Sequence, residues 1–215
     1  MKAFIDLTHP IEEGIPVWPG EPDPEIWASA TLEKDGYTVE SIRIGTHLGT
    51  HMDTPSHFVG GGANLDQIPL ETLIGRAFIL DLTDRGKGQR IRKEDLERYK
   101  GRLHPGARIL LKTGWDRHFR DGTFFEDFPC LTLEAAHYLA SRRIALLGMD
   151  IPSPSPVGDP DNRIHRTLLG AGIIHVEALK DLTLIEEDEC ELIALPPLFK
   201  GFSGAPCRVV AVVER

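Results

Sequence analysis

The residues with the clearest chemical potential lie between His47 and His57, in the stretch HLGTHMDTPSH. Three histidines and one aspartate occupy this segment with the spacing H-x3-H-x-D-x3-H. Imidazole nitrogens and carboxylate oxygens together suit divalent ions such as Zn²⁺, Mn²⁺ or Fe²⁺. A single histidine would more often serve only as a hydrogen-bonding group, but the pattern as a unit favours a metal site over a polar loop.

The local sequence argues against a helix through this segment. Gly49 and Thr50 are poor helix formers, and Pro55 follows them. In an extended chain, alternate side chains point to the same face, so His51 and Asp53 can converge on one ion. We therefore expect an extended segment that presents these two side chains together and ends at the proline.

Two later segments carry groups with the same ligand chemistry. Glu177 lies in the apolar run GIIHVEAL, and a buried acid is costly unless it is paired or bound to a metal. Strand alternation places His175 on the same face, either as a support for the site or as a core histidine. His165, before RTLLG, is equally compatible with a helix start. Asp150 ends the run IALLGMD, and we expect it to orient the proline-rich loop that follows.

Apolar, β-branched runs predict the strands that position these groups. The runs are KAFIDL, SIRIG, AFILDL, ARILLKT, IALLGMD, GIIHVEAL, CELIALP and CRVVAVVER. The helical patterns are KEDLERYK, TLEAAHYLASRR with Thr132 as its cap, and the short HRTLLG ending at Gly170. Strands with few helices indicate an α/β domain with a mixed sheet. Long surface loops that carry binding groups are expected at 14–24, 59–63, 152–160 and 196–206.

Length and composition bound the class of protein. The 215 residues suffice for one well-buried core and contain no evident linker, so we expect a single domain over residues 1–215. A formal net charge of −9 argues against nucleic acid as a partner, and no apolar run approaches the roughly 20 residues that span a bilayer. Cys130, Cys190 and Cys207 are odd in number and widely spaced, and MKAFIDLTHP has no secretory pattern. These features predict a cytoplasmic protein.

The stretch HLGTHMDTPSH resembles the H-x-G-T-H-x-D-x-P-x-H signature of the cyclase family of metal-dependent hydrolases. That family includes bacterial kynurenine formamidases (arylformamidases) and the related isatin hydrolases. The resemblance also covers DLTHPIEEGIPVWPGEPDP, GMDIPSPSP, IHRTLL with IIHVEAL, and ELIALPPLFKGFSGAPCRVVAVV, which together span nearly the whole chain. It implies an α/β single domain of the swivelling β/β/α type, with a mixed, barrel-like sheet and few flanking helices. It also implies a homo-oligomer, at least a dimer, which agrees with the apolar loop residues Phe199 and Phe202.

The resemblance further implies two metal ions, with Zn²⁺ expected and Mn²⁺ as the alternative. His47, His51 and Asp53 would hold one ion, whereas His165 and Glu177 would complete a second site. Asp53 and Glu177 would bridge both ions, so that buried negative charge is offset.

The implied activity is hydrolysis of a small linear amide by metal-activated water. His57 would act as the general acid and base, and Trp18 would line the substrate pocket. Aromatic surface from Trp18 and Phe58 suits an aryl formamide such as N-formylkynurenine, which would release formate in tryptophan catabolism.

Two departures from the family pattern leave the substrate open. Thr54 stands where the family commonly has alanine, and PSPVGDPDNRIH before His165 differs from the formamidases. A cyclic amide such as isatin, or a lactone, is therefore an alternative substrate.

Two alternatives come from other classes of protein. HMD with a distant histidine matches the outline of a 2-His-1-carboxylate Fe²⁺ oxygenase, although IIHVEA lacks the arginine of the 2-oxoglutarate-dependent group. A metal-stabilised binding module without turnover is the other, and the candidate base His57 argues against it.

Overall fold

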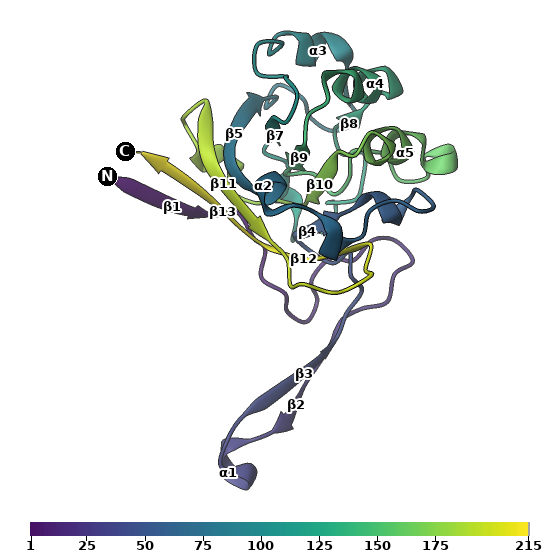
Figure 1. The fold of residues 1–215 in the computed structure, drawn as a ribbon. Coiled ribbons are helices and arrows are strands. Elements are labelled where there is room, and N and C mark those ends of the chain that lie inside the picture. Colours follow the sequence, from purple (N-terminus) through teal and green to yellow (C-terminus); the bar gives the residue numbers. More distant parts are fainter. Residues whose placement is uncertain (215) are drawn as a thin grey trace.

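The computed structural model describes residues 1–214 as an α/β domain built on a curled nine-stranded sheet (Figure 1). Its strands are β1 (Lys2–Asp6), β4 (His51–Asp53), β5 (Ile74–Asp81), β7 (Arg108–Lys112), β9 (Leu146–Met149), β10 (Ile174–Glu177), β11 (Glu189–Leu195), β12 (Gly204–Pro206) and β13 (Arg208–Glu214). They follow the order β1-β13-β11-β5-β7-β9-β10-β4-β12. The central strands β5, β7, β9 and β10 pair in parallel, whereas the outer pairs are antiparallel. The expected mixed, barrel-like sheet is confirmed.

The helices are few and short, in agreement with the sequence prediction. They are α1 (Leu32–Asp35), α2 (Leu70–Leu73), α3 (Lys93–Glu97), α4 (Leu133–Arg142) and α5 (Arg163–Gly170), with 3-10 turns η1 (Pro55–His57), η2 (Leu65–Gln67), η3 (Trp115–His118), η4 (Pro160–Asn162) and η5 (Leu182–Leu184). The cap of α4 forms as expected, because the hydroxyl of Thr132 accepts a hydrogen bond from the Ala135 amide at 3.1 Å. The expected helix ending at Gly170 is α5.

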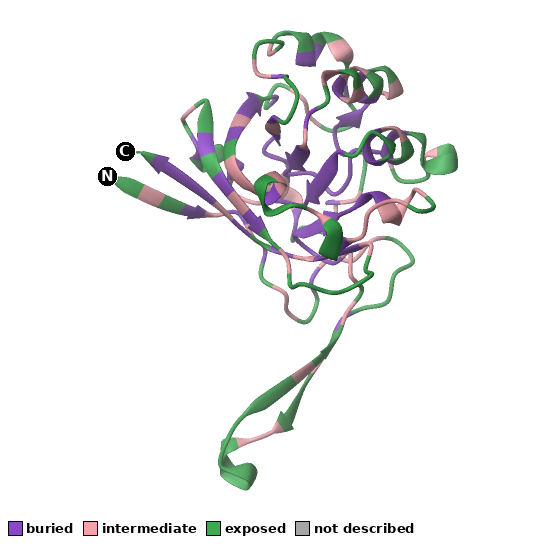
Figure 2. Cartoon of the chain, in the orientation of Figure 1, coloured by how far each residue is buried: buried purple, intermediate pink, exposed green. Residues whose placement is uncertain are grey.

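The two faces of the sheet bury separate apolar layers, because successive side chains of a strand point to opposite sides. On β9, Leu147 and Met149 belong to the layer covered by α3, α4 and α5, and Leu146 belongs to the layer on the opposite face. The two layers bury all residues of β9 and β10 and the middle residues of β7, and Figure 2 shows these strands largely in purple. This explains why β9 and β10 are apolar runs rather than alternating patterns.

Two of the segments expected as surface loops differ from that expectation. Residues 152–155 are buried. The Ser155 hydroxyl in this segment forms a hydrogen bond with Nδ1 of His165 on α5, at 2.9 Å. The end of segment 196–206 forms β12, which pairs with β4 at the edge of the sheet. Polar and proline-rich composition concealed both, since neither segment has an apolar pattern of its own.

A two-stranded arm projects from the body of the molecule (Figure 1). It consists of β2 (Glu25–Ala30) and β3 (Val39–Arg43), which pair antiparallel and carry α1 at their tip. The expected strand SIRIG thus falls largely in this arm rather than in the main sheet. A further two-stranded sheet joins β6 (Arg90–Ile91) to β8 (Cys130–Leu131). None of the helices within residues 1–214 has the length and apolar character needed to cross a membrane.

Candidate metal centre

Paired strands β4 and β10 present four ligand-type side chains on one face of the sheet. In their antiparallel register, His51 lies opposite Glu177 and Asp53 lies opposite His175. Side chains two residues apart on a strand share a face, so the four groups form a compact two-by-two array. The residue between each pair points to the other face and packs in the opposite apolar layer. The extended conformation expected for His51 and Asp53 is confirmed.

His51 is oriented by its own backbone. Its Nδ1 donates a hydrogen bond to the Gly49 carbonyl at 2.8 Å, which leaves Nε2 facing the carboxylates. That Nε2 lies 3.3 Å from Asp53 Oδ1 and 3.7 Å from Glu177 Oε2. Gly49 has a φ of +59°, and a Cβ there would lie 2.9 Å from Ile15 Cδ1. The motif glycine therefore permits the turn that sets this imidazole.

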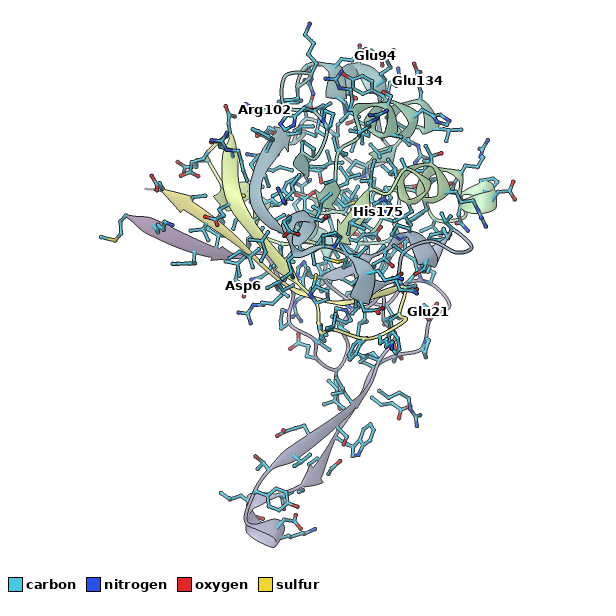
Figure 3. The ribbon with its side chains drawn as sticks, in the orientation of Figure 1. Asp6, Glu21, Glu94, Arg102, Glu134 and His175 are labelled. Atoms are coloured by element: carbon cyan, nitrogen blue, oxygen red, sulfur yellow. The ribbon has the colours of Figure 1, made fainter. Side chains whose placement is uncertain are left out.

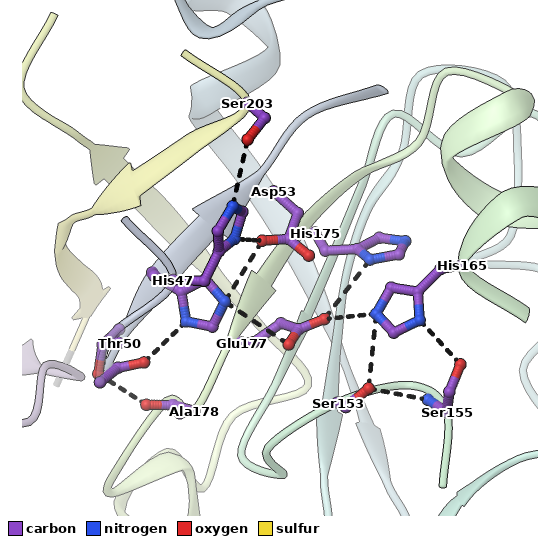
Figure 4. A network of polar contacts seen from close by, with 12 residues as sticks. His47, Thr50, Asp53, Ser153, Ser155, His165, His175, Glu177, Ala178 and Ser203 are labelled. Carbon is purple, nitrogen blue, oxygen red and sulfur yellow. Dashed lines mark hydrogen bonds and ion pairs between the residues drawn. The ribbon is translucent and has the colours of Figure 1, made fainter. Parts of the chain in front are cut away.

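His165 reaches the same point from α5. Its Nδ1 lies 2.9 Å from the Ser155 hydroxyl, and its Nε2 lies 3.5 Å from Glu177 Oε1 and from the Ser153 hydroxyl. The buried segment of GMDIPSPSP thus holds the ring at Nδ1 and directs Nε2 toward Glu177 (Figure 4). The short helix, rather than a strand, supplies this group.

His47 approaches from the loop that precedes β4. Its Nδ1 lies 2.6 Å from Asp53 Oδ1, and its Nε2 lies 3.3 Å from the Ser203 hydroxyl. The ring passes close to Gly204 of β12, where a Cβ would lie 2.6 Å from His47 Cε1. β12 therefore both covers the edge of β4 and leaves room for the imidazole.

The centre opens into a cavity of about 540 Å³. His57, at the end of η1, lines it and stacks on His47 with ring centroids 3.8 Å apart. Trp18 lies on the same wall and packs edge-on against Phe125, at 5.6 Å between ring centroids. Phe58 also lines the cavity, beside the imidazole of His165 at 4.6 Å. The structure therefore brings every residue that the sequence singled out as catalytic, ligating or substrate-binding into one pocket.

Burial and mutual charge set the ionisation of these groups. Burial disfavours the imidazolium of His51, but the hydrogen bond and charge of Asp53 and the charge of Glu177 raise its pKa to about 9. Burial favours the protonated form of Asp53, but the neighbouring imidazoles of His47 and His51 hold its pKa well below the usual range. Burial chiefly lowers the pKa of His57 to about 4, so this ring is neutral at neutral pH.

Unpartnered buried atoms test whether these residues fit a metal. Within residues 1–214, Glu177 Oε1 and both ring nitrogens of His175 have no hydrogen-bond partner. The imidazole nitrogens nearest to Glu177 Oε1 lie 3.5 and 3.6 Å away, beyond the usual N–H···O range of about 2.7–3.2 Å. Such atoms are costly to bury unless a cation or donor satisfies them.

The donor geometry is consistent with two ion positions. Two sets have ligand atoms within 4.8 Å of one another, namely Asp53, His165, His175 and Glu177, and His47, His51 and Asp53. Both sets combine imidazole nitrogen with carboxylate oxygen, which suits Zn²⁺ or Mn²⁺. The residues present therefore fit divalent ions.

Several groups around the cavity were not singled out from the sequence. Phe119, Phe124 and Phe125 line the cavity, and Ser155 and Ser203 orient histidines. The aromatic residues come from the segment after β7, which lacks a motif and reaches the pocket only through the fold. The serines lie within GMDIPSPSP and GFSGAP, so the resemblance covered them without indicating their partners.

Two sequence interpretations change with the contacts. Asp150 does not bond the proline-rich loop but accepts hydrogen bonds from Thr113 and from the Gly114 amide, on the turn after the neighbouring strand β7. Thr54 is buried and is absent from the residues that line the cavity, because its hydroxyl donates to the Ser203 carbonyl at 2.9 Å. The departure from alanine thus fixes the loop that orients His47 rather than shaping the substrate pocket.

The chain is similar to known proteins in sequence and in fold. Residues 5–156 match the model of the cyclase family, described as "Putative cyclase". The chain is 30% identical over 210 residues to a kynurenine formamidase of Bacillus thuringiensis (strain Al Hakam), with 97% of each chain covered. A solved structure described as a potential metal-dependent hydrolase with cyclase activity matches with a TM-score of 0.82, 31% identity and full coverage of both chains. Isatin hydrolase A from Labrenzia aggregata matches with a TM-score of 0.88 at 25% identity, covering 100% of this chain and 94% of the other.

These matches show both the class of the protein and its family. The protein is an enzyme of the hydrolase class, since its full-length relatives and its structural neighbours are hydrolases. The chain belongs to the cyclase family, as the resemblance indicated.

Proposed function

We propose that the protein is a metal-dependent amidohydrolase that cleaves the C–N bond of an aryl formamide such as N-formylkynurenine, releasing formate and the aryl amine. The observation that carries the proposal is the gathering of imidazoles and two carboxylates at the floor of an aromatic-lined cavity. The kynurenine formamidases to which the chain is similar over 97% of its length support this substrate class.

The proposed ligands are those that the sequence indicated. His47, His51 and Asp53 would hold one divalent ion, and His165 and Glu177 would complete the site of a second. Asp53 belongs to both ligand sets, and we propose that Glu177 would also be shared. Glu177 lies between the two sets, since its Oε2 faces His51 and its Oε1 faces His165. When bound, such ions polarise a carbonyl oxygen and lower the pKa of bound water to about 7. Zn²⁺ is the proposed metal and Mn²⁺ the alternative.

His57 is the proposed proton-transfer group. In the part of the chain that the structure describes, its ring nitrogens make no side-chain hydrogen bond, so they are available to substrate and water. Stacking on His47 and edge contact with Phe58 fix the plane of the ring at the cavity wall. One ring nitrogen takes the proton of the attacking water and returns it to the amine nitrogen as the C–N bond breaks. The products are then the neutral amine and formic acid, which loses its proton to solvent and is released as formate.

The aromatic wall positions the aryl group. Trp18 and Phe125 form an edge-on pair at 5.6 Å, and Phe124 extends it at 5.2 Å from Phe125. Aromatic rings favour such offset or edge-on neighbours, so a third ring from the substrate can join the cluster. The formyl group then points toward the carboxylates at the cavity floor.

A cyclic amide or a lactone is the second candidate substrate class. Isatin hydrolase A shares this fold with a TM-score of 0.88, and its ring substrate would fit the same aromatic wall. Asn162, which lies within the segment that departs from the formamidase pattern, and Ser153, which directly precedes that segment, both line the cavity. They are placed to discriminate between the classes.

A hydrolysis screen tests the proposal. N-formylkynurenine, a simple formanilide, isatin and a lactone are compared with and without a chelator, followed by re-addition of Zn²⁺ or Mn²⁺. We expect formate release from the formanilides that chelation abolishes and metal restores. Turnover of isatin alone would transfer the assignment to the cyclic amides, and turnover that persists after complete metal removal would overturn the metal-dependent mechanism.

We further propose that the enzyme is a cytoplasmic homodimer, as the sequence suggested. Cys130, Cys190 and Cys207 are all buried free thiols, which fits a reducing compartment. The projecting arm supplies a surface through which a second copy can bind, as argued in the Discussion.

A further inference from the structure

His175 is a buried imidazole whose ring nitrogens make no hydrogen bond to the described residues. Its side chain is fully buried. Glu177 Oε1 lies 3.6 Å from His175 Nδ1, beyond the usual hydrogen-bond range of about 2.7–3.2 Å. A core histidine normally satisfies at least one nitrogen with a backbone or side-chain group. The ring is therefore placed for a ligand that the protein itself does not supply.

In the register of β4 and β10, His175 and His51 have equivalent positions relative to the two carboxylates. Each histidine lies two residues from a carboxylate on its own strand and directly opposite a carboxylate on the other strand. The array is thus a checkerboard, with imidazoles at one pair of diagonal corners and carboxylates at the other. A ligand atom of His175 also lies within 4.8 Å of those of Asp53, His165 and Glu177.

The three proposed histidine ligands, His47, His51 and His165, are each oriented by an oxygen atom of the protein, whereas His175 is not. Each has one nitrogen held by an oxygen of the protein and the other directed at a carboxylate, the holding groups being the Gly49 carbonyl, the Ser155 hydroxyl and the Ser203 hydroxyl. Metal-binding histidines are commonly oriented in this way. His175 instead is locked by packing, because its backbone lies inside a fully buried strand and its ring contacts that of His165 at 5.6 Å.

We infer that His175 is a direct ligand of the deeper ion, so that this ion is bound by His165, His175 and the two shared carboxylates. The inference rests on the proposed metal centre and deepens it. Each ion position then has two imidazoles, and Asp53 belongs to both ligand sets. Glu177 would be shared through its Oε2, which lies 3.7 Å from His51 Nε2. The deeper ion gains a fourth protein ligand, which is the number that tetrahedral Zn²⁺ usually takes.

Counting the coordinated histidines in the unmodified protein tests this inference directly. Protein labelled with ¹⁵N-histidine is loaded with two equivalents of ¹¹³Cd²⁺, and ¹¹³Cd–¹⁵N couplings are measured by NMR. We expect couplings from four imidazoles, with the fourth assigned to His175. Coupling to only His47, His51 and His165 would overturn the inference, because a histidine that merely supports the site shows no direct coupling.

A variant provides the energetic test. His175→Ala should bind one equivalent of Zn²⁺ with unchanged affinity and the second at least about 100-fold more weakly, since even supporting residues of metal sites change affinity by about 10–100-fold. His9→Ala is the matched control, because His9 is also buried and its Nε2 also lacks a partner, but it belongs to neither ligand set. Equal affinity of His175→Ala and the unmodified protein for both equivalents would contradict the proposal.

The outcomes separate this inference from the proposed function. If the unmodified protein binds no divalent metal, the metal-dependent function itself fails. If it binds two equivalents and hydrolyses the formanilide, but ¹¹³Cd couples to three histidines only, the function stands and the role of His175 is wrong.

Discussion

At the scale of single residues, orientation distinguishes histidines of the same type. His51 and His165 are turned by hydrogen bonds that occupy Nδ1 and leave Nε2 to face Glu177. His57 has no such bond among the described residues and is held only by ring contacts. Ligands need a fixed lone pair, whereas a proton-transfer group needs an accessible nitrogen. The same residue type therefore divides into two roles within eleven positions of sequence.

Replacing His57 separates proton transfer from metal binding. We expect His57→Ala to retain both metal equivalents and to lower kcat for the formanilide by about 10²–10⁴-fold, the usual contribution of a general acid–base group. Metal content by elemental analysis and initial rates of formate release check this. His104→Ala, at an exposed site distant in sequence, is the control. Hydrolysis at the unmodified rate would show that another group moves the proton.

At the scale of elements, the turn η1 positions His57 by close packing against a glycine. A Cβ on Gly62 would lie 2.7 Å from the Pro55 carbonyl carbon and 2.8 Å from the Ser56 nitrogen. Those atoms belong to the backbone of η1, so they cannot move without moving the turn. The glycine thus fixes how deeply the turn, and the imidazole at its end, enters the cavity.

Gly62→Ala should therefore reduce activity without removing any functional group. We expect kcat/KM to fall roughly tenfold or more, because small displacements of a catalytic group are costly. The matched control is Gly60→Ala, where no atom lies within 4 Å of the added Cβ and φ is not positive. Steady-state kinetics of the two variants decide the matter. Comparable activity of both variants would contradict the role given to this packing.

The helix α3 makes a pH-dependent contribution to stability. Asp95 accepts hydrogen bonds from the Arg92 amide and from both Nε and Nη2 of Arg85. Burial favours the protonated acid, but these bonds outweigh it and lower the pKa of Asp95 below its usual 3.8. The stabilisation is therefore complete above pH 3.8 and is lost as the pH falls through the lower value of the folded state.

Asp95→Asn isolates this contribution. We expect the free energy of unfolding at neutral pH to fall by about 1–2 kcal/mol, because the amide keeps only one acceptor oxygen. Urea denaturation of metal-free protein at neutral pH and below pH 3.8 checks the prediction, and the gap between variant and parent should narrow in acid. Glu94→Gln, an exposed carboxylate of the same helix, should leave stability nearly unchanged. A gap that is constant with pH would refute the assignment.

The sequence predicted the elements whose own residues carry an apolar run or a capping signal. The apolar runs of β9 and β10 and the cap of α4 are examples. The sequence did not predict β4 and β12 as strands of the sheet, because each is only three residues long and depends on its neighbours for pairing. The ligand residues were recognised from spacing and resemblance, but the checkerboard that includes His175 follows only from the register of two strands distant in sequence.

At the scale of the whole molecule, the arm is the feature that the monomer does not explain. The hairpin is largely exposed along both strands (Figure 2). Its exposed apolar side chains include Trp27 and Ile42 on the strands and Tyr37 in the connection between them. Figure 3 shows the side chains of this arm extending from a ribbon that the body of the molecule does not cover. A two-stranded hairpin alone is marginally stable in water, so its apolar groups need cover from another surface. We propose that a second copy of the chain covers the arm, since two arms related by a twofold axis can each pack against the body of the other protomer.

The arm should therefore hold the proposed dimer together. We expect the unmodified protein to have twice the 23.9 kDa mass of one chain in light scattering, and Trp27→Glu with Ile42→Glu to shift it to one chain. Phe4→Glu is the control, because Phe4 is 72% exposed but lies on β1, away from the arm. Charges placed on a buried interface are costly to desolvate, whereas charges on a free surface are not. A parent protein that is monomeric at every concentration would disprove the dimer, and a dimer that survives both arm substitutions would assign its interface to another surface, such as that around Phe199 and Phe202.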